Sequence, residues 1–129
     1  MVIDSTGVAI DADDPALILV GFESERGGAR HYLMLQRSRE LDQQDIASGM
    51  DAVYIERDDQ GHSAYGGITR FELRRDRALI RLDDDTAGKL GGEGEIEVRF
   101  GLDDEQFEGL RAALAEVFHG FDTFINPAI

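Results

Sequence analysis

The sequence predicts an α+β fold, in which an antiparallel β-sheet of about five to seven strands carries a C-terminal α-helix packed on one face. Three strand-like runs separated by two polar turns lie between residues 51 and 82, a pattern typical of an antiparallel meander. Further strand-like runs precede this meander. One alternating strand and a helix with an apolar stripe follow it, and this helix is expected to cover the sheet.

Length and composition favour one domain spanning residues 1–129. A chain of this size buries about two thirds of the surface that its unfolded form exposes. The sequence has no cysteine, which excludes disulfides, thiolate metal sites and thiol nucleophiles. No basic segment followed by an apolar stretch opens the chain, and no run approaches the roughly 18 apolar residues of a membrane span. We therefore expect a cytoplasmic protein that does not bind a membrane.

Charge is the most unusual bulk property. The chain has 13 lysine and arginine residues against 27 aspartate and glutamate residues, a formal net charge of −14. Such a field repels the phosphates of nucleic acids, so direct nucleic-acid binding is not expected, and it speeds encounter with a basic partner. Solubility alone is the other interpretation of the same charge.

The first third of the chain is predicted to supply sheet strands. Residues 8–10 form an edge-strand candidate, ended at residues 11–15, where proline and short acidic side chains favour a turn. The run at residues 16–22 is apolar on both faces, as in an interior strand. Residues 25–28 predict a hairpin, after which residues 30–36 return as the next strand.

The middle of the chain holds a loop and then the meander. Residues 37–50 are polar with poor periodicity, so we expect a long loop with at most a short helical turn. A strand at residues 52–57 and a polar turn at residues 58–61 follow. The next run, residues 63–74, changes phase at Gly66-Gly67, which predicts a bulge or a sharp bend.

The last strand of the meander is expected at residues 78–82. The run Asp83-Asp-Asp85 can then cap a short helix at residues 86–90. Residues 95–100 alternate between apolar and charged side chains, so one face of the sheet meets water at this strand.

The C-terminal helix has the clearest boundary signals. Asp103 is a capping residue, and Gln106 follows at the spacing of a capping box. The tail, residues 121–129, is too apolar for a free end, so it packs against the body or meets a second chain to form a homodimer. The helix's apolar stripe, expected to face the sheet, consists of Phe107, Leu110, Leu114, Val117 and Phe118.

The acidic runs and the histidines give no metal-binding pattern. Asp83 starts an acidic run that suggests calcium, but at EF-hand spacing the fifth position is Ala87 and the twelfth is Gly94, which leaves too few ligands. The three histidines are separated by whole elements and lack the spacing of zinc sites. We expect helix caps and solvated turns, with no metal and no other cofactor.

No motif of an enzyme is present. Ser63 beside His62 lacks a nucleophile elbow. Gly88-Lys89 is followed by leucine, so a phosphate-binding loop is not formed. We expect a protein that is not an enzyme.

An acidic surface bearing tyrosines is the candidate binding site. Tyrosine offers rigid contact area with a polar tip, and carboxylates offer bidentate sites for arginine, so the combination suits capture of a basic protein. An ordinary solvated hairpin edge, with Tyr65 in the core, is the other interpretation. The expected contact residues are Asp42, Asp45, Tyr54, Glu56, Asp58, Asp59 and Tyr65.

A series of short motifs, specific through their order, extends through the chain from about residue 30 to about residue 114. They are Tyr32-Leu-Met-Leu-Gln-Arg-Ser38, Gln44-Asp45, Gly49-Met-Asp51, Tyr54-x-Glu56, Asp59-Gln60, Ser63 and Tyr65-Gly-Gly67. In this order the chain resembles the immunity protein 10 family of bacterial polymorphic toxin systems. The first 29 residues and the apolar tail lie outside the resemblance.

The resemblance implies an intracellular role similar to that of an antitoxin, which is encoded beside a toxin and blocks it by binding, without catalysis. The implied partner is a cognate toxin domain, and the charge argument makes that domain basic. The resemblance fixes no contact residues, so the residues named above depend on charge and tyrosine placement alone. A non-catalytic adaptor or structural protein of another bacterial system is the alternative function, and a hydrolase is the third.

Overall fold

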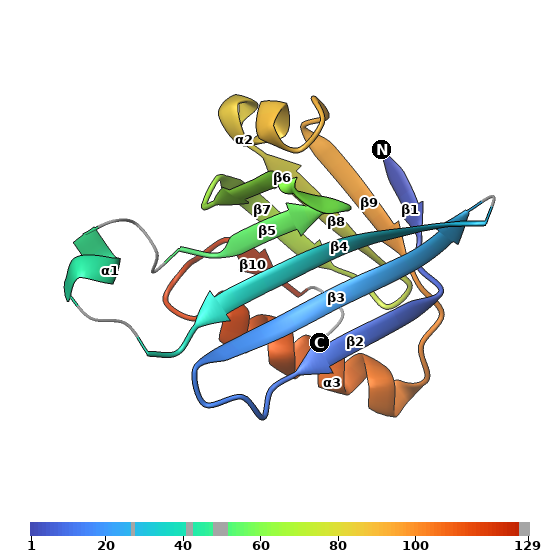
Figure 1. Ribbon diagram of the computed structural model, residues 1–129. Coiled ribbons are helices and arrows are strands. Elements are labelled where there is room, and N and C mark those ends of the chain that lie inside the picture. Colours follow the sequence, from blue (N-terminus) through green and yellow to red (C-terminus); the bar gives the residue numbers. More distant parts are fainter. Residues whose placement is uncertain (27, 41–42, 48–51, 127–129) are drawn as a thin grey trace.

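The computed structural model describes residues 1–26, 28–40, 43–47 and 52–126 (Figure 1). Strands dominate the described part of the chain, and the longest helix lies near its C-terminal end. In chain order the elements are β1 Val2–Asp4, β2 Gly7–Asp11, β3 Leu17–Arg26, β4 Ala29–Ser38, α1 Gln43–Ala47, β5 Tyr54–Arg57, β6 Asp59–Tyr65, β7 Ile68–Leu73, β8 Arg77–Leu82, α2 Asp84–Lys89, β9 Glu95–Arg99, α3 Asp104–Val117 and β10 Phe124–Ile125.

The strands form two five-stranded sheets, which Figure 1 shows one in front of the other. The front sheet has the order β2-β3-β4-β5-β6 and is antiparallel throughout. The rear sheet has the order β1-β9-β8-β7-β10, with antiparallel pairs in its centre. Its edge strands β1 and β10 each run parallel to their neighbour, so segments from both ends of the chain complete the rear sheet.

The predicted α+β class and the packed C-terminal helix are confirmed, and the strands are divided between two sheets. The division arises because the run at residues 63–74 is broken into β6 and β7. Gly66 and Gly67 lie at the break with φ values of 79° and 86°, a backbone conformation that residues with a Cβ atom rarely adopt. The bend predicted at this pair is confirmed, and there the meander leaves the front sheet for the rear one.

The bend at Gly66-Gly67 packs closely against the start of α2. A Cβ atom added to Gly67 would lie 1.8 Å from the Oγ1 atom of Thr86, so only glycine fits this position without movement. The backbone N–H of Asp83 donates a hydrogen bond to the carbonyl of Gly67 at 2.9 Å. The Asp83 side chain caps α2 by accepting from the N–H of Thr86 at 2.7 Å, as predicted.

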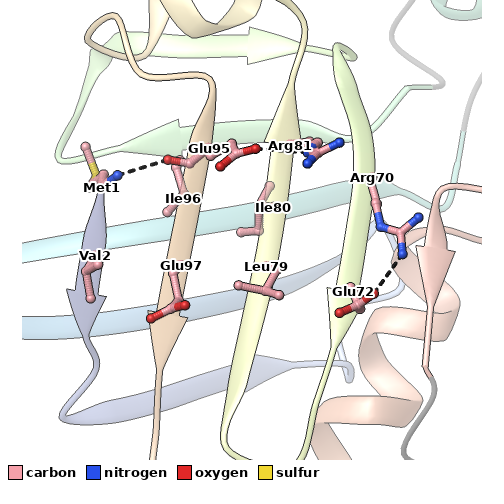
Figure 2. A pocket seen from close by; sticks show the side chains of 10 residues that line it. All are labelled: Met1, Val2, Arg70, Glu72, Leu79, Ile80, Arg81, Glu95, Ile96 and Glu97. Carbon is pink, nitrogen blue, oxygen red and sulfur yellow. Dashed lines mark hydrogen bonds and ion pairs between the residues drawn. The ribbon is translucent and has the colours of Figure 1, made fainter.

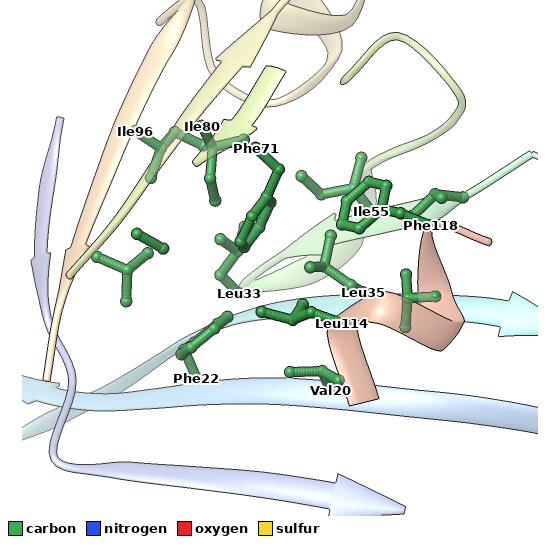
Figure 3. Close-up of a cluster of buried hydrophobic side chains, with 14 of the residues drawn as sticks. Val20, Phe22, Leu33, Leu35, Ile55, Phe71, Ile80, Ile96, Leu114 and Phe118 are labelled. Atoms are coloured by element: carbon green, nitrogen blue, oxygen red, sulfur yellow. The ribbon is translucent and has the colours of Figure 1, made fainter. Parts of the chain in front are cut away.

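Apolar side chains from both sheets and from α3 form one core, which Figure 3 shows in close-up. Strand alternation sends every second side chain inward, so directly paired residues of neighbouring strands meet there. The Phe71 ring lies 5.2 Å from that of Phe118 and 6.1 Å from that of Phe124. The core residues labelled in Figure 3 are Val20, Phe22, Leu33, Leu35, Ile55, Phe71, Ile80, Ile96, Leu114 and Phe118.

The helix α3 contacts β2, β3 and β4 of the front sheet. It begins with the predicted capping box: the Asp103 side chain accepts from the N–H of Gln106 at 2.8 Å, and the Gln106 side chain accepts from the N–H of Asp103 at 3.1 Å. The rest of the predicted stripe is buried, except for Phe107, which is half-buried under the Arg75 guanidinium.

The apolar tail packs against the body of the protein as far as it is described. Phe124 and Ile125 pair with β7, and the Phe124 ring stacks on that of Phe118 at 5.8 Å. The short helix α1 agrees with the helical turn expected between residues 37 and 50. Within the described ranges no helix combines the length and the apolar character needed to cross a membrane.

Candidate protein-binding site

All three tyrosines of the chain lie on the outer face of the front sheet, on neighbouring strands. Tyr32 is on β4, Tyr54 on β5 and Tyr65 on β6, and the next residue or the previous one in each strand points into the core. Tyr54 and Tyr65 are direct cross-strand partners, with ring centroids 5.0 Å apart. Tyr65 is 51% exposed and so does not belong to the core.

Glu56 joins two of these tyrosines through its carboxylate. The Tyr54 hydroxyl donates to Oε1 at 2.6 Å, and the Tyr32 hydroxyl donates to Oε2. Glu56 is only 6% exposed. We call Tyr32, Tyr54, Tyr65 and Glu56 together the tyrosine face.

The same hydrogen bonds change the acidity of the phenols. The bond to Glu56 is the main cause that raises the pKa of Tyr32 to about 12. Burial, followed by the bond to Glu56, raises the pKa of Tyr54. Both hydroxyls are therefore neutral donors at physiological pH, and the carboxylate fixes the orientation of two rings.

Exposed carboxylates lie on other parts of the same sheet. Met34 and Ser63 flank Glu56 as its cross-strand partners, so the centre of the face is largely uncharged apart from Glu56 itself. The exposed carboxylates of the front-sheet strands include Asp11, Glu23, Glu25 and Asp59. An aromatic centre with an acidic rim is the layout of many protein-binding surfaces.

Asp58 and Asp59, both expected to contact a partner, have different roles. Asp58 has a positive φ of 66° and turns its carboxylate back, where it accepts from the backbone N–H of Tyr32 at 3.0 Å and lies 3.2 Å from His31 Nδ1. Asp59 accepts from the N–H of Gly61 at 2.8 Å, and its side chain is 62% exposed. Asp59 is thus more available to a partner than Asp58.

The predicted turn at residues 58–61 is therefore wrong in extent. Strand β6 already begins at Asp59, and the pairing of β5 with β6 shifts register between Glu56 and Arg57. The turn is confined to Asp58, because a single residue with positive φ and an irregular pair reverse the chain here.

The two remaining predicted contact residues lie in or beside α1. Asp42 is outside the described residues, and Asp45 belongs to α1 without a described side chain. The structure thus brings together Tyr54, Glu56 and Tyr65, with Asp59 at the rim.

Tyr32 is the member of the tyrosine face that the sequence analysis missed. A signal for it existed: Tyr32 and Met34 are two residues apart in one strand, so their side chains point to the same face, and Met34 pairs with Glu56. Finding it required the register between β4 and β5, which no short-range pattern specifies.

The outer face of the rear sheet differs from the tyrosine face, because its charged side chains pair with one another (Figure 2). Arg81 lies 3.1 Å from Glu95, and Glu72 accepts from Arg70 and Arg74, each at 2.7 Å. A groove of about 470 Å³ crosses this face, and its lining includes the ion pairs Arg70–Glu72 and Arg81–Glu95. The arginines of this sheet and its turns include Arg70, Arg74, Arg77, Arg81 and Arg99.

The residues considered for nucleophilic chemistry bond to different partners. The Ser63 hydroxyl donates to the carbonyl of Gln60 at 2.8 Å, whereas His62 Nδ1 lies 3.0 Å from Asp59 Oδ1. In the part of the chain that the structure describes, no three histidine, cysteine, aspartate or glutamate side chains lie close enough together to hold a metal ion.

Comparison with protein-family models gives a match to Immunity protein 10 over residues 3–108. The match includes the first 29 residues, which the resemblance seen in the sequence did not cover, and it ends within α3. Comparison with curated proteins finds no match, and comparison with solved structures also finds none.

Proposed function

The chain belongs to the immunity protein 10 family, and on this premise we propose that it binds and neutralises a cognate toxin of a bacterial polymorphic toxin system. The proposed inhibitor acts in the cytoplasm by covering a surface that the toxin needs, without catalysis and without a cofactor. Its partner is a basic toxin domain, and its binding surface is the tyrosine face with the acidic rim.

The observation that carries this proposal is the gathering of all three tyrosines on one face of the front sheet. Figure 1 shows no described helix or strand in front of β4, β5 and β6. Tyrosine is enriched among residues that dominate binding energy, because its ring buries a large area at a small cost in side-chain entropy. The bonds to Glu56 reduce that cost further by holding two rings in place.

Charge supports a basic partner at this face. Glu23 and Glu25 are exposed carboxylates of the front sheet, whereas Glu72 and Glu95 of the rear sheet pair with arginines. A net charge of −14 also attracts a basic protein over longer distances. Phe124 of the tail packs against Phe118 of the same chain, so this ring is used within the chain and is not needed for a homodimer.

Binding kinetics against the toxin domain encoded beside this chain test the proposal. Tyr65→Ala and Tyr54→Ala are each expected to weaken binding by about 1 to 4 kcal/mol, mainly through faster dissociation. Phe121→Ala is the matched control, because Phe121 is another exposed aromatic residue, 43% exposed, that follows α3 and does not belong to the front sheet. Protection of cells that express the toxin should follow the same order.

Two results would contradict the proposal in different ways. If Phe121→Ala weakens binding while both tyrosine variants bind like the wild type, the partner uses another surface. If the wild-type chain neither binds nor protects against that toxin, the function itself is wrong.

A further inference from the structure

Two glutamates are buried among the described residues, one on the outer face of each sheet. Glu56 in the front sheet is 6% exposed and Glu72 in the rear sheet is 7% exposed. Glu72 is neutralised within the chain, because Arg70 and Arg74 each donate to it at 2.7 Å. Their hydrogen bonds lower its pKa. Figure 2 shows the bond from Arg70. The two sites therefore form a natural comparison between a buried carboxylate with cations and one without them.

Among the described residues, the groups that donate to Glu56 are both neutral: the hydroxyls of Tyr32 and Tyr54. A buried carboxylate is costly unless a cation or several hydrogen bonds compensate for the water that it has lost. Residues 40–56 contain five acidic residues and no lysine, arginine or histidine, so the segment that leads into Glu56 offers no cation. Arg57 is next in the chain, but its Nη1 donates to the carbonyl of Leu90 at 2.9 Å.

From this contrast we infer that Glu56 is the receptor for an arginine side chain of the toxin, which completes the cation pairing that Glu72 obtains within its own chain. The inference rests on the proposed function and specifies the chemistry of the partner at the same surface. Each carboxylate oxygen of Glu56 accepts one tyrosine hydroxyl and keeps a second acceptor site.

Arginine fits this site better than lysine. A guanidinium group is planar, so it stacks on aromatic rings while its N–H groups donate to a carboxylate. Tyr54 and Tyr65 provide neighbouring rings 5.0 Å apart beside Glu56. An ammonium group is more strongly hydrated and lacks the planar contact, so it loses more on entering a surface of this kind.

A double-mutant cycle between the two proteins tests the inference. Glu56→Gln removes the charge but keeps the shape, and it is expected to weaken toxin binding by about 30-fold or more. Each arginine of the toxin domain is then replaced by glutamine in turn. For one of them, the combination with Glu56→Gln should weaken binding no more than either single change, because both changes remove the same contact.

The matched control is Glu105→Gln, which removes an exposed charge from α3, outside the front sheet. It should change the equilibrium constant by less than about threefold. If Glu56→Gln lowers the melting temperature too far for binding measurements, Glu56→Asp replaces it. That variant keeps the charge but withdraws the carboxylate by one methylene, and it should also weaken binding.

The outcomes separate this inference from the proposed function. If Tyr54→Ala weakens binding while Glu56→Gln and Glu56→Asp bind like the wild type, Glu56 receives no cation, although the chain still binds the toxin. If the effect of Glu56→Gln on binding is fully additive with that of every arginine substitution in the toxin, the carboxylate only positions Tyr32 and Tyr54, and the inference is wrong. If the wild type does not bind the toxin, both the inference and the proposed function are wrong.

Discussion

The hydrogen bond from Tyr32 to Glu56 couples the protonation of one tyrosine to folding. The carboxylate stabilises the protonated phenol and raises the pKa of Tyr32 from 10.0 to about 12. A group whose pKa is higher in the folded state stabilises the fold below its unfolded pKa and loses that effect as the pH rises through its folded pKa. The stabilisation by Tyr32 is thus complete below about pH 10 and is lost by about pH 12.

Tyr32→Phe is therefore expected to lower the free energy of unfolding by about 1.5 to 3 kcal/mol at pH 8, the usual contribution of a hydrogen bond to a charged group. The difference from the wild type should shrink as the pH rises from 10 to 12. Urea unfolding at a series of pH values measures it, with Tyr65→Phe as the exposed control. A difference that stayed constant to pH 12 would show that the bond to Glu56 is not its source.

The turn between β6 and β7 makes a sharp prediction at the scale of elements. Gly67→Ala should cost about 2 to 4 kcal/mol, because the change combines a positive φ with overpacking against Thr86. Gly66→Ala has a similar φ, but its new Cβ would lie 3.6 Å from Ala52, so only about 1 to 2 kcal/mol of backbone strain is expected. Urea unfolding measures the loss of stability in each variant. Equal losses would show that close packing between the bend and α2 adds nothing at Gly67.

The packing of α3 gives a second test at this scale. Leu110 is fully buried, so Leu110→Ala should lower the free energy of unfolding by about 2 to 5 kcal/mol. Glu108 is exposed and contacts Arg111 of its own helix, so Glu108→Ala should change stability by less than about 0.5 kcal/mol. Thermal or urea unfolding decides the matter: small changes from both variants would mean that α3 contributes little to the core.

These elements also show what the sequence could predict. The capping box at Asp103, the apolar stripe of α3 and the bend at Gly66-Gly67 are short-range patterns, and all three are confirmed. The edge strands of the rear sheet, β1 and β10, could not be predicted, because they are too short to show periodicity and pair with strands far along the chain. Tyr32 was missed for a related reason, since its place beside Glu56 depends on the register of β4 with β5.

At the scale of the whole molecule, net charge governs how the chain meets its partner. With a charge of −14, the association rate with a basic toxin should fall by about 10- to 10³-fold between low and high ionic strength. Asp59→Asn, at the exposed rim, should mainly slow association, whereas Tyr54→Ala should mainly speed dissociation. Surface-plasmon kinetics at two salt concentrations separate these effects. An association rate that does not depend on salt would rule out electrostatic steering.

Because the chain divides at Gly66-Gly67, the ribosome makes the whole front sheet before most of the rear sheet. All strands of the front sheet lie within residues 7–65, so they emerge before four of the five rear-sheet strands, β7 to β10, and before α3. During that interval the side chains of Val20, Leu35 and Ile55 have no partner layer. The nascent chain therefore passes through a stage with an exposed apolar sheet, when it depends most on chaperones and is most prone to aggregate.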